Sequence, residues 1–170
     1  MQEILVSFIG VLGTLSSIMF AYLAFKKSEN KLAQEEGALL SDIKYIKPEY
    51  KYGNSRFDIY IETETEKIFV EVKGVTLENN GVVRFPDAPT ERGVKHLNEL
   101  QKAVTEGYNA YVLFVVQMSD VKYFEPNRET HPQFADALKQ AKANGVIPLA
   151  YDCSVTPDCI EIRNPICIKI

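Results

Sequence analysis

Two neighbouring apolar runs constrain the fold of this chain more than any other feature of its sequence. Residues 57–62 and 68–73 are rich in β-branched and aromatic side chains, and a five-residue polar segment separates them. Each run is typical of a β-strand, and the polar segment suits a hairpin loop. The pattern predicts an antiparallel strand pair that has Asp58 near its start and Glu71 and Lys73 near its end.

The polar residues of this hairpin predict a metal site. Residues two apart on a strand share a face, so Glu71 and Lys73 lie side by side, and strand pairing can bring Asp58 close to them. Two carboxylates and the backbone carbonyl of Val72 suit Mg²⁺, or Mn²⁺, and leave positions for water and a phosphate oxygen. Lys73 can then orient the water or neutralise transition-state charge. The alternative is a solvated hairpin with an ordinary Glu–Lys pair.

The wider sequence resembles a known family. The order of the two carboxylates and the lysine is similar to the PD-(D/E)xK nuclease pattern. Three longer blocks resemble the sugar fermentation stimulation protein A (SfsA) family: YGNSRFD at residues 52–58, VEVKGVTL at 70–77 and FPDAPTERGVKHL at 85–97. The likeness continues through residues 113–117 and 124–127.

This resemblance spans residues 30–170 and implies a restriction-endonuclease-like α/β fold, in which helices flank a mixed sheet. It implies metal-dependent cleavage of DNA or RNA with Asp58, Glu71 and Lys73 as the catalytic residues. The family is also described as DNA-binding, with a regulatory role in sugar (maltose) metabolism. It has an OB-like N-terminal domain, and in this chain a short apolar segment stands in that place.

The resemblance points to further site residues outside the hairpin. Glu35 matches a helix whose glutamate reaches the metal in nucleases of this fold, although a solvated helix face explains it equally well. Asp87 can orient the metal or a neighbouring arginine, or it can have a turn or helix-capping role. Arg56 flanks Asp58 and can bind phosphate or pair with an acidic neighbour.

A helix predicted over residues 90–106 has an apolar stripe that includes Leu97 and Leu100 and is expected to face the core. A group of basic residues lies largely on its other side. Arg92, Lys95 and His96 lie near its N-terminus, where free backbone N–H groups favour a phosphate. A lone histidine is often structural, so His96 has both interpretations. Gln117 ends a strand predicted at residues 110–116 and is expected beside the site.

The remaining elements follow from periodicity and from turn residues. The sequence predicts a turn at residues 53–55, a loop or irregular hairpin at 74–89 and a second helix at 134–144. Four further strands are predicted at residues 43–52, 146–151, 160–163 and 166–170. Three cysteines near the C-terminus fit no zinc spacing and are interpreted as reduced apolar residues.

The N-terminal segment predicts a membrane anchor. Residues 4–25 contain no charged side chain. A helix of this length is long enough to cross a hydrocarbon core of about 30 Å. Lys26 and Lys27 follow and place the C-terminal side in the cytoplasm, tethered to the inner face of the membrane. We therefore divide the chain into an anchor at residues 1–27 and a nuclease-fold domain at 28–170. The alternative is a helix that packs on this domain or on a partner, which leaves the protein cytoplasmic without a tether.

Charge narrows the functional classes. A formal net charge of −4 excludes a protein that coats nucleic acid by bulk charge, so binding would need a local basic face and a metal ion. Three hypotheses remain: a Mg²⁺- or Mn²⁺-dependent nuclease, a nucleic-acid-binding regulatory protein with little cleavage, and a membrane-tethered interaction module. The oligomeric state does not follow from the sequence.

Overall fold

A hairpin and two strand–helix–strand units build the frame of the domain, which a computed structural model describes over residues 43–170. Nine strands and two helices lie within this range. In chain order they are β1 (Tyr45–Tyr52), β2 (Ser55–Glu62), β3 (Lys67–Val75), β4 (Leu77–Asn79), β5 (Val82–Phe85), α2 (Glu91–Thr105), β6 (Asn109–Val116), β7 (Tyr123–Pro126), α3 (Pro132–Ala143), β8 (Ile147–Thr156) and β9 (Cys159–Pro165).

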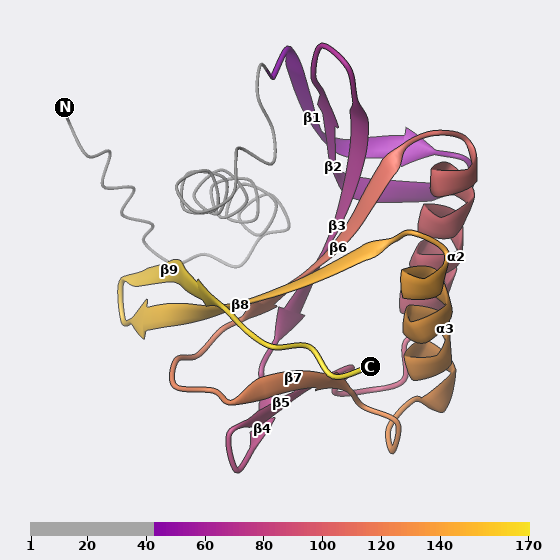
Figure 1. The fold of residues 1–170 in the computed structure, drawn as a ribbon. Coiled ribbons are helices and arrows are strands. Elements are labelled where there is room, and N and C mark those ends of the chain that lie inside the picture. Colours follow the sequence, from indigo (N-terminus) through magenta and orange to yellow (C-terminus); the bar gives the residue numbers. More distant parts are fainter. Residues whose placement is uncertain (1–42) are drawn as a thin grey trace, which may run out of the picture.

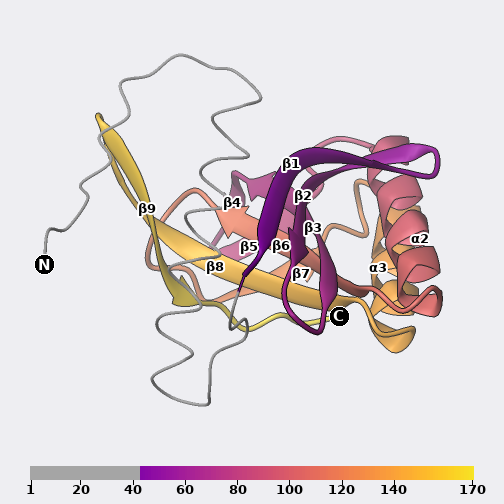
Figure 2. The same cartoon turned by 90° about the horizontal axis from the view of Figure 1, so that it is seen from above.

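Six strands form a large mixed sheet in the order β1-β2-β3-β6-β8-β9. The β1–β2, β2–β3 and β8–β9 pairs are antiparallel, whereas β3–β6 and β6–β8 are parallel. The two parallel pairs are joined through α2 and α3, and both crossovers step in the same direction across the sheet. Because such crossovers share one hand, both helices pack on the same face, as Figures 1 and 2 show. The mixed α/β class predicted from the sequence is confirmed.

The sheet separates two apolar clusters. The larger cluster lies between the sheet and the helices and includes Phe69, Leu100 and Phe134. The smaller cluster occupies the other face and is built from strand residues such as Val70 and Leu113. Successive residues of β6 enter the two clusters alternately, so this strand is buried on both faces, as its continuous apolar run predicts.

Helix α2 begins and ends close to where its sequence predicts. The Thr90 side chain accepts a hydrogen bond from the Gly93 N–H at 3.0 Å, which satisfies one of the free donors at the helix start. Leu97 and Leu100 are buried against the sheet. His96 is also buried, although the sequence placed it on the opposite side from the apolar stripe. This burial brings a histidine to the sheet face from which Glu71 projects.

A small second sheet lies at one end of the large one and has the order β4-β5-β7 (Figure 1). The β4–β5 hairpin occupies part of the segment predicted as a loop or irregular hairpin, and β7 was not predicted. Residues 166–170 were predicted as an edge strand. They instead run beside β7, where Phe124 and Ile168 form an isolated parallel bridge.

The predicted membrane anchor at residues 4–25 and the predicted ligand Glu35 lie outside the described residues. Between residues 43 and 170 the structure has no helix long and apolar enough to cross a membrane.

Candidate active site on the β2–β3 hairpin

Strands β2 and β3 part at Asp58, and this opening creates the site. Their last ladder pair is Ile59 with Val70, so Asp58 and Glu71 come next in register. The two carboxylates are close enough for the charge of Glu71 to raise the pKa of Asp58. Instead of a further backbone pair, the Asp58 Oδ2 atom accepts a hydrogen bond from the Val72 N–H at 2.7 Å. The side chain thereby takes over one ladder bond and is fixed beside β3.

Glu71 is held through one of its two carboxylate oxygens. Its side chain is only 3% exposed, and Oε1 contacts both the Lys73 ammonium at 2.5 Å and the His96 Nδ1 atom. The other oxygen, Oε2, is buried and has no hydrogen-bond partner among residues 43–170. A buried carboxylate oxygen without a partner is costly, and an approaching cation would satisfy it.

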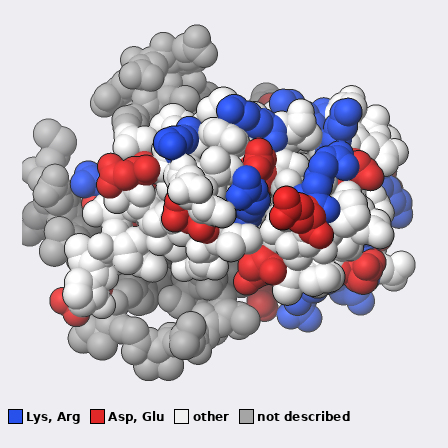
Figure 3. All heavy atoms as spheres, turned by 90° about the horizontal axis from the view of Figure 1, so that it is seen from below, with Lys and Arg blue, Asp and Glu red and all other residues white. Residues whose placement is uncertain are grey.

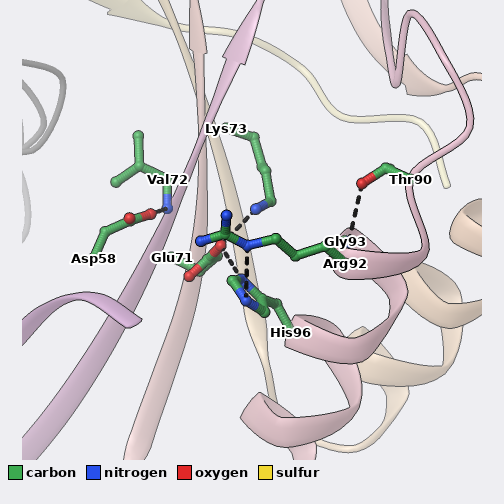
Figure 4. A network of polar contacts seen from close by, with 8 residues as sticks. All are labelled: Asp58, Glu71, Val72, Lys73, Thr90, Arg92, Gly93 and His96. Carbon is green, nitrogen blue, oxygen red and sulfur yellow. Dashed lines mark hydrogen bonds and ion pairs between the residues drawn. The ribbon is translucent and has the colours of Figure 1, made fainter. Parts of the chain in front are cut away.

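A chain of contacts continues from Glu71 to the surface through helix α2 (Figure 4). The Arg92 Nε–H donates to the His96 Nε2 atom at 3.4 Å, and Arg92 itself is exposed. Its guanidinium group lies in front of the Glu71 carboxylate in this view. Glu71, His96 and Arg92 therefore form a line from the buried sheet face to solvent.

The two carboxylates have opposite pKa shifts. Burial, followed by the negative charge of Glu71, raises the pKa of Asp58 from 3.8 to about 6, although the Val72 hydrogen bond and Lys73 oppose this. Burial also acts to raise the pKa of Glu71, but the hydrogen bond from His96 and the charge of Lys73 outweigh it and lower the pKa. Glu71 is thus stable as an anion, whereas at Asp58 the nearby positive charge does not outweigh burial and the charge of Glu71.

These residues fit a divalent cation in part. Asp58 and Glu71 supply carboxylate oxygens at neighbouring positions of the hairpin, which suits a hard cation. The Oε2 atom of Glu71, which has no partner among the described residues, is the oxygen most available to such an ion. Residues 43–170 contain no converging group of three or more histidine, cysteine, aspartate or glutamate side chains. Further oxygens would come from the backbone, from water or from a phosphate, as is usual for Mg²⁺.

The other residues predicted for the site have different surroundings. Arg56 is exposed two positions before Asp58, with Nη1 3.4 Å from the Glu49 carboxylate on β1. The Lys95 ammonium donates to the Asn54 carbonyl at 2.6 Å and so ties α2 to the β1–β2 turn. Asp87 is exposed in the segment that leads into α2 and has no side-chain hydrogen bond or ion pair within the described residues.

Gln117 lies where the sequence predicts, beyond the end of β6. Its N–H donates to the Val75 carbonyl at the end of β3, at 3.0 Å. Its side-chain amide lies over Gly74, because a Cβ atom at that position would come within 3.0 Å of Nε2. A glycine directly after Lys73 therefore leaves room for a polar side chain beside the hairpin.

A second set of contacts, which the sequence did not reveal, fixes the segment before α2. The buried Asn127 side chain donates to the Pro86 carbonyl at 3.0 Å, and the His131 Nδ1 atom accepts from the Thr90 N–H at 3.3 Å. The sequence signal was limited to the presence of Asn127 in a block resembling the family. These contacts set the start of the helix that delivers His96.

The surface around the fold shows no broad basic face in the view of Figure 3. Lysine and arginine are interspersed there with aspartate and glutamate, at the end of the molecule where β4 and β5 lie. A separate hollow of about 300 Å³ lies at the loop end of the β2–β3 hairpin, away from Asp58, and glutamates 62, 64, 66 and 106 are among its lining residues. Such an acidic hollow does not suit a phosphate.

Comparison with known proteins gives the family. The family model described as "Sugar fermentation stimulation protein RE domain" matches residues 23–159. A sugar fermentation stimulation protein homolog from Clostridium beijerinckii is 62% identical over 138 residues, which are 79% of this chain and 61% of that protein. A homolog from Ruminiclostridium cellulolyticum is 52% identical over 147 residues, which are 85% of this chain and 65% of that protein.

A solved structure agrees in fold. The structure of Pyrococcus furiosus SfsA in complex with Ca²⁺ superposes with a TM-score of 0.73 at 30% identity, over 88% of this chain and 65% of that one. The chain spans less than two thirds of the length of these three relatives. The resemblance drawn from the sequence is confirmed, and the chain belongs to the sugar fermentation stimulation protein family.

Proposed function

We propose that this domain is a metal-dependent nuclease that hydrolyses phosphodiester bonds of DNA or RNA on a restriction-endonuclease-like frame. One observation supports this most directly. The buried Glu71 carboxylate is fixed through Oε1, and its Oε2 atom has no partner among residues 43–170, next in register to Asp58. A structural ion pair would be expected to satisfy both oxygens, whereas a cation site needs one of them free.

The cofactor of the proposal is Mg²⁺ or Mn²⁺, with Asp58, Glu71 and the Val72 carbonyl as ligands. The related SfsA structure from Pyrococcus furiosus was solved with Ca²⁺, a cation that also takes oxygen ligands. When bound, such an ion lowers the pKa of its water and polarises the phosphorus centre. Glu35 stays a candidate ligand from the part of the chain that the structure does not describe.

Side chains of this domain would bind the phosphate groups and neutralise their charge. The Lys73 side chain is 14% exposed and its ammonium lies next to Glu71, so it can reach a phosphate oxygen and neutralise charge that develops there. The exposed guanidinium group of Arg92 can hold a neighbouring phosphate through its Nη atoms, because its contact with His96 uses only Nε. Arg56 and Gln117 extend this surface along the strands.

Three of the predicted site residues, Lys95, His96 and Asp87, are not given a contact with nucleic acid in this proposal. Lys95 donates to a backbone carbonyl, and both ring nitrogens of His96 already have partners. Asp87 is an exposed carboxylate and would repel phosphate.

The full chain should be assayed on single- and double-stranded DNA and RNA with Mg²⁺, Mn²⁺ or EDTA. We expect cleavage with either metal, loss in EDTA, and a fall of at least about 100-fold in Asp58→Ala and Glu71→Gln, since each removes an anionic ligand. Glu64→Gln is the matched control, because Glu64 is an exposed carboxylate at the far end of the same hairpin. Equal trace activity in the wild type and in Asp58→Ala would refute the nuclease.

A second candidate function is a nucleic-acid-binding regulatory protein with little or no cleavage. The relatives of this chain are named for the stimulation of sugar fermentation, which favours this alternative. Binding to duplex DNA should then persist in EDTA and weaken steeply with salt, because phosphate contacts release counterions. Absent or salt-independent binding would remove this candidate.

A further inference from the structure

The buried His96 uses both nitrogens of its ring, and this determines where its proton lies. Arginine can only donate hydrogen bonds, so the contact between Arg92 Nε and His96 Nε2 makes Nε2 an acceptor. A neutral ring then has its proton on Nδ1, the atom that faces the Oε1 atom of Glu71. The Glu71 carboxylate, which can only accept, and Arg92, which can only donate, therefore select the same tautomer, in which His96 donates to Glu71.

This donor acts together with Lys73, and both reach the same carboxylate oxygen. A lysine ammonium on a four-carbon stem is a mobile partner, and contact with a phosphate would draw it away from Glu71. The His96 ring is only 6% exposed and is held by the packing of α2, so it stays in place. With His96 present, the carboxylate keeps its orientation whichever way Lys73 points.

We propose that His96 is a positioning residue that locks the Glu71 carboxylate, so that Oε2 faces a divalent cation while Lys73 is free to serve the substrate. The role rests on the proposed function, because the cation is part of that function. His96 itself is neither a metal ligand nor a phosphate contact, since Nδ1 donates to Glu71 and Nε2 accepts from Arg92. Partners of this kind orient metal ligands in many sites.

Three substitutions separate this role from simple core packing. In His96→Asn the side-chain nitrogen is bonded to Cγ, as Nδ1 is in histidine, so the donor to Glu71 is retained. In His96→Gln the nitrogen lies one bond further out, at the level of Nε2, and that donor is lost. His96→Ala removes both groups.

Calorimetric titration of the full chain with Mn²⁺ alone measures the effect. We expect affinity to fall about tenfold or more in His96→Ala and His96→Gln, and to stay within about threefold of the wild type in His96→Asn. Urea unfolding of each variant shows whether it is folded. Two results would overturn the role of His96 but not the proposed cation site: equal Mn²⁺ affinity in all four proteins, or an affinity of His96→Asn no higher than that of His96→Gln. A wild type that binds no Mn²⁺ would overturn the proposed cation site and this role with it.

The tautomer gives a test that needs neither a variant nor a metal. The chain contains two histidines, so long-range ¹H–¹⁵N spectra of the wild type assign the ring of His96 with little ambiguity. We expect the proton on Nδ1, because the Glu71 carboxylate can only accept there and Arg92 can only donate to Nε2. A proton on Nε2 in the wild type would refute the arrangement even if the protein binds cations.

Discussion

At the scale of single residues, Asp58 works against the stability of the domain. Its pKa is raised to about 6 in the folded protein, so ionisation opposes folding. This group therefore favours the folded state most below pH 3.8, and the advantage is lost as the pH rises through about 6. By pH 8, the difference between the two pKa values corresponds to about 3 kcal/mol at most.

We predict that Asp58→Asn unfolds at higher urea concentration than the wild type at pH 8 in EDTA. The amide keeps an oxygen for the Val72 N–H and removes the charge. The free energy of unfolding should increase by about 1–3 kcal/mol, and the two proteins should differ little at pH 4. A variant that is less stable than the wild type at pH 8 would contradict the assigned burial of the charge.

Arg92 and Lys95 provide a second test at this scale, because both are exposed cations on α2 but have different partners. Arg92→Gln should reduce the slope of log affinity for duplex DNA against log salt by about 0.9, the value for one phosphate contact. Lys95→Gln should leave that slope unchanged, because the Lys95 ammonium is bound to the Asn54 carbonyl. Fluorescence anisotropy at several salt concentrations measures both, and a larger effect for Lys95 would reverse the assignment.

The sequence predicted the residues of the hairpin better than those of the helix. Strand alternation alone places Glu71 and Lys73 on one face, and in the structure the Lys73 Nζ atom lies 2.5 Å from the Glu71 Oε1 atom. Helix periodicity predicted the buried Leu97 and Leu100 but assigned His96 to the opposite side. A polar residue is counted as exposed unless its partner is known, and the partner here is Glu71, 25 positions earlier in the chain.

At the scale of elements, Gly93 allows α2 to approach α3. A Cβ atom at this position would lie 2.9 Å from the Thr90 Cγ2 atom and 3.1 Å from a ring carbon of Phe134. We predict that Gly93→Ala lowers the free energy of unfolding by about 1–3 kcal/mol, although alanine favours helices. Gly74→Ala is the control. The added Cβ atom would meet only the side-chain amide of Gln117, at the end of a flexible side chain, so the free energy of unfolding should fall by less than about 1 kcal/mol in thermal or urea unfolding. Equal costs would mean that α2 and α3 can separate without penalty.

Long apolar elements were predictable, whereas short ones were not. The pattern predicted β1, β2, β3, β6 and both helices to within a few residues. Strand β7 is four residues long and forms because β5 and residues 166–170 lie on either side of it. Such short strands depend on pairing between distant segments, which local propensity does not contain.

At the scale of the whole molecule, a cation bound at the site should stabilise the fold. Ligands that bind only the folded state add about 2.7 kcal/mol at a hundredfold excess over the dissociation constant. For a chain of this size we expect Mn²⁺ to raise the melting temperature by about 5–10 °C. Differential scanning fluorimetry with Mn²⁺ and with EDTA measures the shift. Asp58→Ala should remove it, and a shift of equal size in that variant would place the stabilising cation elsewhere.

The position of His96 on a helix that comes after the hairpin has a consequence for synthesis. A nascent chain releases residues 58, 71 and 73 from the ribosome well before residue 96. Until α2 docks, Glu71 lacks its contact with His96. If the domain is the proposed nuclease, its site would therefore stay incomplete until residue 96 has left the ribosome and α2 has folded onto the sheet.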